Sequence, residues 1–121
     1  MRFYELPMDG REPVKLTLNM GALADLSASD HELWQRYNTL YTKMQNMGPK
    51  DSFNELEMGE LMYIAYRCGM LHSNEQPMSR SDFLYAMTDD RAAIGQVFQA
   101  LYGVQEKKSD FQRPSGKPRR R

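Results

Sequence analysis

The sequence has few of the residues on which reactive sites most often depend, with one cysteine and two histidines among 121 residues. A single cysteine, Cys68, excludes an intrachain disulfide, and a reducing compartment is expected. His31 and His72 lie far apart, and no second histidine follows His31-Glu32 one helical turn later, which excludes the zinc-protease pattern. Cys68 falls in an apolar helical pattern, whereas an activated thiolate needs a cationic and partly exposed setting. We therefore expect no metal, no cofactor and no catalytic residue.

Long apolar runs and glycine-rich loops are also missing. No stretch of about 18 apolar residues occurs, so we expect no membrane span. Residues 48–52 lack the spaced glycines of a phosphate-binding loop, and residues 1–5 lack the features of a secretory signal. Asp89 and Asp90 diverge by about 100° on a helix, which makes a shared acid–base site awkward. The acids expected to form a solvated helix face are Glu55, Glu57 and Glu60. Together these features predict that the protein is not an enzyme.

Charge is distributed unevenly along the chain, although it sums to zero. Residues 1–104 hold nine basic and fourteen acidic residues, a balance of −5, and residues 105–121 hold seven basic and two acidic residues, a balance of +5. An acidic body with a basic tail indicates a protein that contacts other macromolecules. We do not expect nucleic acid to be the partner, because the acidic body would repel a duplex. The tail residues that could hold phosphates by charge are Lys107, Lys108, Arg113, Lys117, Arg119, Arg120 and Arg121.

The N-terminal region predicts a β-hairpin. Residues 3–6 alternate, Asp9-Gly10 favours a two-residue turn, and residues 14–18 alternate cleanly at period two. Thr17 is expected to face water. Pro13 has no N–H for a sheet hydrogen bond, so its part of the strand is expected at an edge. The side chains expected to face the body are Val14, Leu16 and Leu18.

Two helices are expected to follow the hairpin. The first is short, over residues 20–26. Ser29 and Glu32 have the spacing of a capping box, in which hydroxyl and carboxylate each bind an exposed backbone N–H, and they predict the start of the second helix. Gly48-Pro49 ends it, because glycine tolerates the left-handed cap and proline stops the helix. Its apolar stripe contains Leu33, Trp34, Tyr37, Leu40, Tyr41, Met44 and Met47.

The later helices are expected to begin at Ser52, Ser79 and Thr88–Asp90. Glu55 completes a capping box with Ser52, and Asp82 stands at the same spacing from Ser79. The last helix is expected to stop at Gly103. Gly95, in the middle of that helix, costs about 1 kcal/mol relative to alanine, and close packing would explain its presence.

The helix that begins near Ser52 is apolar on two opposite faces. Such a helix is either central in its fold or offers its second face to a partner. We retain both alternatives. One face contains Leu61, Ile64, Ala65, Cys68 and Leu71. The opposite face contains the candidate protein-binding residues Tyr63, Tyr66 and Met70, for a client protein or a second copy of the chain.

These elements predict a mainly α (α+β) fold. Residues 1–104 are expected to form a single helical domain in which the N-terminal β-hairpin packs on a bundle of about four to five helices. Residues 105–121 show no periodicity and are expected to form a disordered basic tail. The ten methionines fill cores, and they also suit adaptable binding surfaces.

Three stretches together resemble the tail assembly chaperones of long-tailed (siphovirus-type) bacteriophages or prophages. They are Val14–Leu26, a strand running into a short helix, Glu60–Tyr66 within a long helix, and Met78–Phe83 before the final helix. The resemblance covers most of residues 1–103 through pattern and element order. The tail is similar only in being short, polar and charged.

The resemblance implies a function without catalysis. Such chaperones bind the long, aggregation-prone tape measure protein, help to recruit tail tube protein subunits, and are absent from the mature virion. Many are made in a short and a longer form through programmed ribosomal frameshifting, and this chain would be the short form. The implied location is the host bacterial cytoplasm.

Two other functions remain open at the level of sequence. A small DNA-binding or regulatory phage protein would use the basic tail to contact phosphates. A head–tail connector component would stay in the finished particle. Self-association through the second apolar helix face is compatible with each of these functions.

Overall fold

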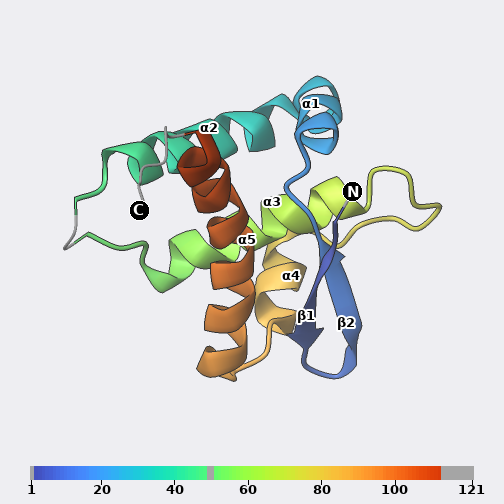
Figure 1. Ribbon diagram of the computed structural model, residues 1–121. Helices are drawn as coiled ribbons and strands as arrows, with labels where there is room; N and C mark the ends of the chain where they lie inside the picture. The colour runs from blue at the N-terminus through green and yellow to red at the C-terminus, as the bar shows by residue number, and fades with distance from the viewer. Residues whose placement is uncertain (1, 49–50, 113–121) are drawn as a thin grey trace.

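The structure, a computed structural model, describes residues 2–48 and 51–112 and has an N-terminal hairpin followed by helices. The mainly α fold class with an N-terminal β-hairpin is therefore confirmed. Helix α3 crosses the middle of the molecule, with α1 and α2 on one side and the hairpin and α4 on the other (Figure 1). The elements are β1 (Tyr4–Met8), β2 (Arg11–Leu16), α1 (Met20–Ser29), α2 (His31–Asn46), α3 (Glu55–Gly69), α4 (Arg80–Ala86) and α5 (Arg91–Gln112).

Strands β1 and β2 form the predicted antiparallel hairpin. Leu6 pairs with Val14, and the Asp9-Gly10 turn contains Gly10 at a φ of 73°, a conformation that glycine adopts without steric penalty. The prediction that Thr17 faces water is wrong, because its side chain is buried. The strand ends at Leu16, and the Thr17 N–H donates instead to the Ala65 carbonyl of α3 at 3.1 Å. This bond ties the hairpin to the central helix.

Two of the predicted helix caps are wrong in position. Helix α1 runs through Ser29, and the Asp30 carboxylate accepts the Leu33 N–H at 3.1 Å to begin α2. Likewise Asn54, rather than Ser52, caps α3 and shares a capping box with Glu57. Aspartate and asparagine present the same kind of oxygen acceptor as serine, so the sequence contains competing caps within two residues of each other.

The starts of α4 and α5 agree with the starts predicted from the sequence. The Ser79 hydroxyl accepts the Asp82 N–H at 3.1 Å, and the Asp90 carboxylate accepts from the N–H groups that begin α5. The predicted stop at Gly103 is wrong, because α5 continues to Gln112. Glycine lowers helix propensity but keeps its N–H, so it does not interrupt the helical hydrogen bonds. Of the predicted tail, residues 105–112 continue α5, and residues 113–121 lie outside the described residues.

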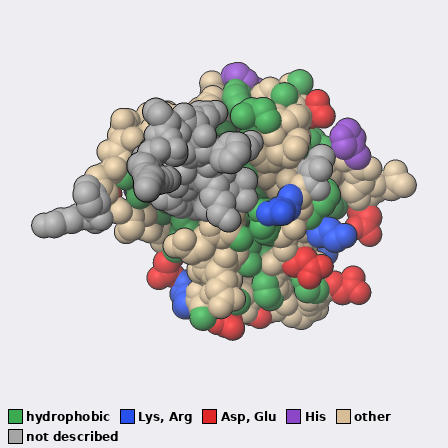
Figure 2. Space-filling view, in the orientation of Figure 1, with side chains coloured by type: hydrophobic (Ala, Val, Ile, Leu, Met, Phe, Trp, Pro, Cys, Tyr) green, Lys and Arg blue, Asp and Glu red, His purple; other side chains and the backbone are tan. Residues whose placement is uncertain are grey.

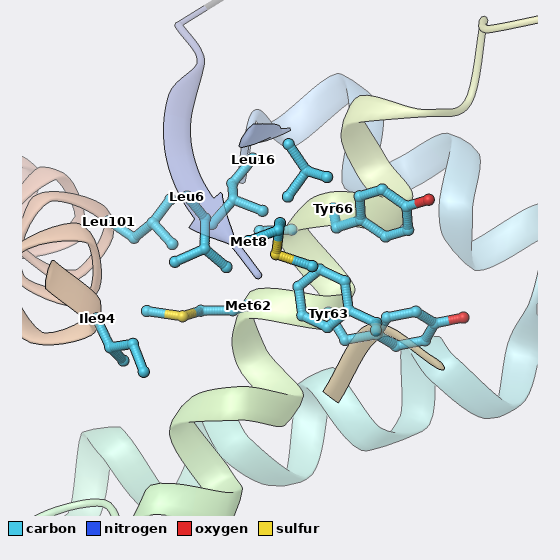
Figure 3. Close-up of a cluster of buried hydrophobic side chains, with 11 residues drawn as sticks. Leu6, Met8, Leu16, Met62, Tyr63, Tyr66, Ile94 and Leu101 are labelled. Carbon is cyan, nitrogen blue, oxygen red and sulfur yellow. The ribbon is translucent and has the colours of Figure 1, made fainter. Parts of the chain in front are cut away.

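Helix α3 separates two hydrophobic cores, which shows that it is central in the fold. Every residue from Gly59 to Tyr66 is buried. Figure 3 shows the core on the hairpin side, which contains Leu6, Met8, Val14, Leu16, Met62, Tyr63, Ala65, Tyr66, Phe83, Ile94 and Leu101. The core on the side of α1 and α2 contains Ala22, Leu23, Leu26, Tyr37, Leu40, Leu61, Ile64 and Cys68.

An ionic cluster joins the helices around α3. Glu60 was predicted on a solvated face, but its side chain is only 10% exposed. Its carboxylate accepts from Arg36 Nε of α2 at 2.9 Å and from Arg80 Nη2 of α4 at 2.7 Å. The burial of Glu60 is tolerated because both of its oxygens are paired. Helices α2, α3 and α4 are therefore held together by one carboxylate.

Within the described part of the chain, none of the helices has the length and apolar character required to cross a membrane.

Candidate protein-binding groove

The two tyrosines predicted to contact a partner are part of the core. Tyr63 is 4% exposed and Tyr66 is 3% exposed, and both rings contact Phe83 of α4. The Tyr63 hydroxyl donates to the Met78 carbonyl at 2.9 Å, and the Tyr66 hydroxyl accepts the Met78 N–H at 2.8 Å. Of the two alternatives for this helix face, the structure shows burial for both tyrosines, because α4 and the segment before it cover them. Met70 is half-buried and packs against the same core.

The predicted electrostatic tail can be placed only in part. Lys107 and Lys108 lie within α5. Residues 113–121, which include the other predicted tail cations Arg113, Lys117, Arg119, Arg120 and Arg121, lie outside the described residues.

The cysteine lies where the sequence placed it, in an apolar setting. Cys68 is buried in the core on the side of α1 and α2, and burial raises the pKa of its thiol to about 12. The thiol is therefore protonated at neutral pH and a poor nucleophile. Over residues 2–48 and 51–112, no group of three or more histidine, cysteine, aspartate or glutamate residues is placed to hold a metal ion.

A hollow with a partly apolar lining lies where the start of α3, the end of α4 and the start of α5 meet. Its volume is about 530 Å³. Leu56, on its wall, is 56% exposed, although leucine is usually buried. We call this hollow the α3–α5 groove, and it is lined by Glu55, Leu56, Met58, Gly59, Leu84, Met87, Thr88, Asp89, Arg91, Ile94 and Gly95.

The chemistry of the groove is an apolar floor with charges at its edge. Leucine, isoleucine and methionine provide the floor, and methionine adapts its shape to different partners. Arg91 and Glu55 form an ion pair, and both side chains are largely exposed. Asp89 is exposed and forms no ion pair with any side chain that the structure describes. Figure 2 shows hydrophobic side chains next to acidic and basic ones along the lower edge of the molecule, where α5 begins.

Two helical glycines of the groove have different environments. A Cβ added at Gly59 would lie 2.9 Å from Leu84 Cδ2, so this glycine lets α4 approach α3 closely. A Cβ added at Gly95 would meet no atom of the described chain within 4 Å. The expectation that close packing explains Gly95 is therefore not met by contacts that the structure describes.

A second, shallower hollow of about 240 Å³ adjoins the groove through Leu84. It is lined by Arg80, Ser81, Leu84 and Tyr85, and Tyr85 is 88% exposed. The hollowed surface therefore continues beyond the groove along α4. Sequence reasoning missed the α3–α5 groove because its residues come from separate helices, although it singled out Gly95, which lines the groove.

Comparisons with protein-family models, with curated proteins and with solved structures gave no match to this chain. The description of the α3–α5 groove therefore rests on its own geometry.

Proposed function

We propose that the chain is a phage tail assembly chaperone in its short form. In this proposal it binds and solubilises the tape measure protein in the host bacterial cytoplasm and helps to recruit tail tube protein subunits. It would leave the assembly before the virion matures. The observation that carries the proposal is the α3–α5 groove, an apolar hollow of about 530 Å³ at the surface of a helical domain.

The groove suits a client that is a long amphipathic helical chain. Such a chain exposes stripes of apolar side chains, which aggregate unless they are covered. A hollow of this volume accommodates several side chains, and its leucine and methionine residues can adjust to stripes of different sequence. A chaperone that must cover many segments of one client benefits from this adaptability.

Co-expression with the tape measure protein of the same phage tests the proposal. We expect the wild-type chain to keep the tape measure protein in the soluble fraction and to co-purify with it. Leu56→Asp should abolish both effects while far-UV circular dichroism stays unchanged, because Leu56 is 56% exposed. Met20→Asp is the matched control, since Met20 is 69% exposed on α1 and lies outside the groove.

Three results would contradict the proposal. The first is a tape measure protein that stays insoluble beside the wild-type chain. The second is DNA binding that depends on residues 113–121, with a log–log salt slope near −4.5 for about five neutralised phosphates, which indicates the nucleic-acid alternative. The third is recovery of the chain from purified virions, which indicates a connector. A slippery run in the gene at the codons for Lys107-Lys108 would support the chaperone.

A further inference from the structure

Gly95 points to a partner that approaches α5 closely. The residue lies within α5 and in the wall of the α3–α5 groove, where glycine weakens the helix relative to alanine. Gly59, in the same wall, is explained by Leu84, whereas Gly95 has no neighbour in the described chain within 4 Å of the position that a Cβ would take. A glycine that weakens its helix without a packing partner among the described residues has a physical reason if a second molecule fills that space.

The walls of the groove favour a helix over an extended peptide as the bound segment. Its walls are the helices α3, α4 and α5 together with the linker residues 87–89. The backbone groups of the helices are largely satisfied within each helix, so the helical walls offer no strand edge to an extended peptide. An amphipathic helix needs no such edge, because it binds through apolar side chains spaced by three and four residues. Glycine at the crossing point lets two helix backbones approach more closely than larger residues allow.

The charged side chains that line the groove indicate which polar residues should flank the apolar stripe of the bound helix. The lining contains the carboxylates Glu55 and Asp89 and the guanidinium of Arg91. Arg91 is paired with Glu55, and Asp90 caps α5, which leaves the exposed Asp89 without an ionic partner among the described side chains. A lysine or arginine beside the apolar stripe of the occupant would pair with Asp89.

We propose that the α3–α5 groove binds an amphipathic helix that crosses α5 over Gly95 and places a basic residue against Asp89. The inference rests on the proposed function, since it assigns the site and the chemistry of the client segment. Leucine or methionine side chains of that helix would fill the floor beside Leu56, Met58 and Leu84, and the exposed apolar surface would be covered.

A designed peptide tests the site independently of the tape measure protein. The probe is a fluorescent helix of about 20 residues with a leucine stripe flanked by lysines, and a second version has glutamates in their place. Gly95→Ala should raise the melting temperature by about 4 °C, since alanine favours the helix and meets no neighbour. The same variant should bind the lysine probe several-fold more weakly, because the methyl group occupies the crossing point.

A larger residue and a charge reversal sharpen the test. Gly95→Leu should weaken binding roughly ten- to hundred-fold through overpacking at the interface. Gln96→Ala, next to it on α5 and outside the groove lining, should bind as the wild type does. The wild type should prefer the lysine probe, and Asp89→Lys should reverse the preference toward the glutamate probe.

Binding of the probe that is unchanged in both Gly95 variants would overturn the inference. So would a dimer in analytical ultracentrifugation that Gly95→Leu dissociates, because a second copy would then occupy the groove. If the probe binds as expected but the tape measure protein is not solubilised, the groove assignment stands and the proposed function fails. If the tape measure protein is solubilised and the Gly95 variants have no effect, the proposed function stands and the groove assignment fails.

Discussion

The two ends of helix α3 differ in how completely the rest of the chain covers them. Around Tyr63 and Tyr66 the helix is enclosed by the hairpin, α1, α2 and α4, and these tyrosines are nearly inaccessible. Near its start, Leu56 is 56% exposed and Met58 lines an open groove. Both ends carry large apolar side chains. Coverage by neighbouring elements therefore distinguishes the core from the open groove here, and the hydrophobicity of the residues does not.

The largest expected effect on stability comes from removing the Phe83 ring, which covers Tyr63 and Tyr66 of α3. Phe83 is fully buried and its ring centroid lies 5.3 Å from that of Tyr63 and 5.0 Å from that of Tyr66. Phe83→Ala should lower the free energy of unfolding by about 3–5 kcal/mol, measured by urea denaturation. Tyr85→Ala, which removes an exposed aromatic side chain from the same helix, should change it by less than about 0.5 kcal/mol. Equal losses would mean that α4 does not cover the tyrosines.

Two leucines of α3 compare the ends directly. Leu61 is 7% exposed and Leu56 is 56% exposed. Leu61→Ala should lower the free energy of unfolding by about 2–5 kcal/mol through lost burial and a cavity. Leu56→Ala should change it by less than about 0.5 kcal/mol. Chemical denaturation of both variants measures the difference, and a comparable loss at Leu56 would show that the start of α3 is covered.

The ionic cluster around Glu60 should have a smaller effect. Glu60→Gln removes the charge that accepts from Arg36 and Arg80, and it should lower the free energy of unfolding by about 1–3 kcal/mol. Thermal unfolding followed by circular dichroism measures the change. Glu75→Gln, at an exposed position in the segment before α4, is the control and should have no measurable effect. A neutral result for Glu60→Gln would mean that the arginines find equivalent partners.

The smallest expected effect on stability comes from Asn54, the N-cap of α3. Asn54→Ala should lower the free energy of unfolding by about 1 kcal/mol, because the Asn54 side chain accepts the Glu57 N–H at 2.8 Å. Ser52→Ala should have no effect, since Ser52 is not the cap. The opposite ranking in thermal unfolding would restore the cap predicted from the sequence.

The same cap contributes a pH dependence. The hydrogen bond from Lys43 and that from the Asn54 N–H lower the pKa of Glu57. A lowered pKa in the folded state means that the contribution of this carboxylate is present above its unfolded pKa and is lost as the pH falls through the folded value. Glu57→Gln should therefore flatten the acid side of a plot of melting temperature against pH, and an unchanged slope would contradict this assignment.

Local signals predicted much of the fold. The Asp9-Gly10 turn, the alternation after it and the Ser79 cap all depend on residues a few positions apart, and the structure contains each of them. The predicted helix boundaries failed where two local signals competed, as at Ser52 and Asn54, or where a weak helix breaker such as Gly103 was given too much weight. The predicted exposure of Thr17 and Glu60 failed because contacts with distant elements bury them. The candidate site could not be predicted in this way, because its walls come from helices that are distant in sequence.

By itself the sequence determined that α3 has two apolar faces, since the positions of its side chains follow from helical geometry. Only the tertiary structure decided which of its apolar side chains are covered, because burial depends on where α4, α5 and the hairpin pack. Tyr63 and Tyr66 lie beneath α4, whereas Leu56 lies at the edge of a groove. Periodicity is set along the chain, but accessibility is set by contacts between distant parts of it.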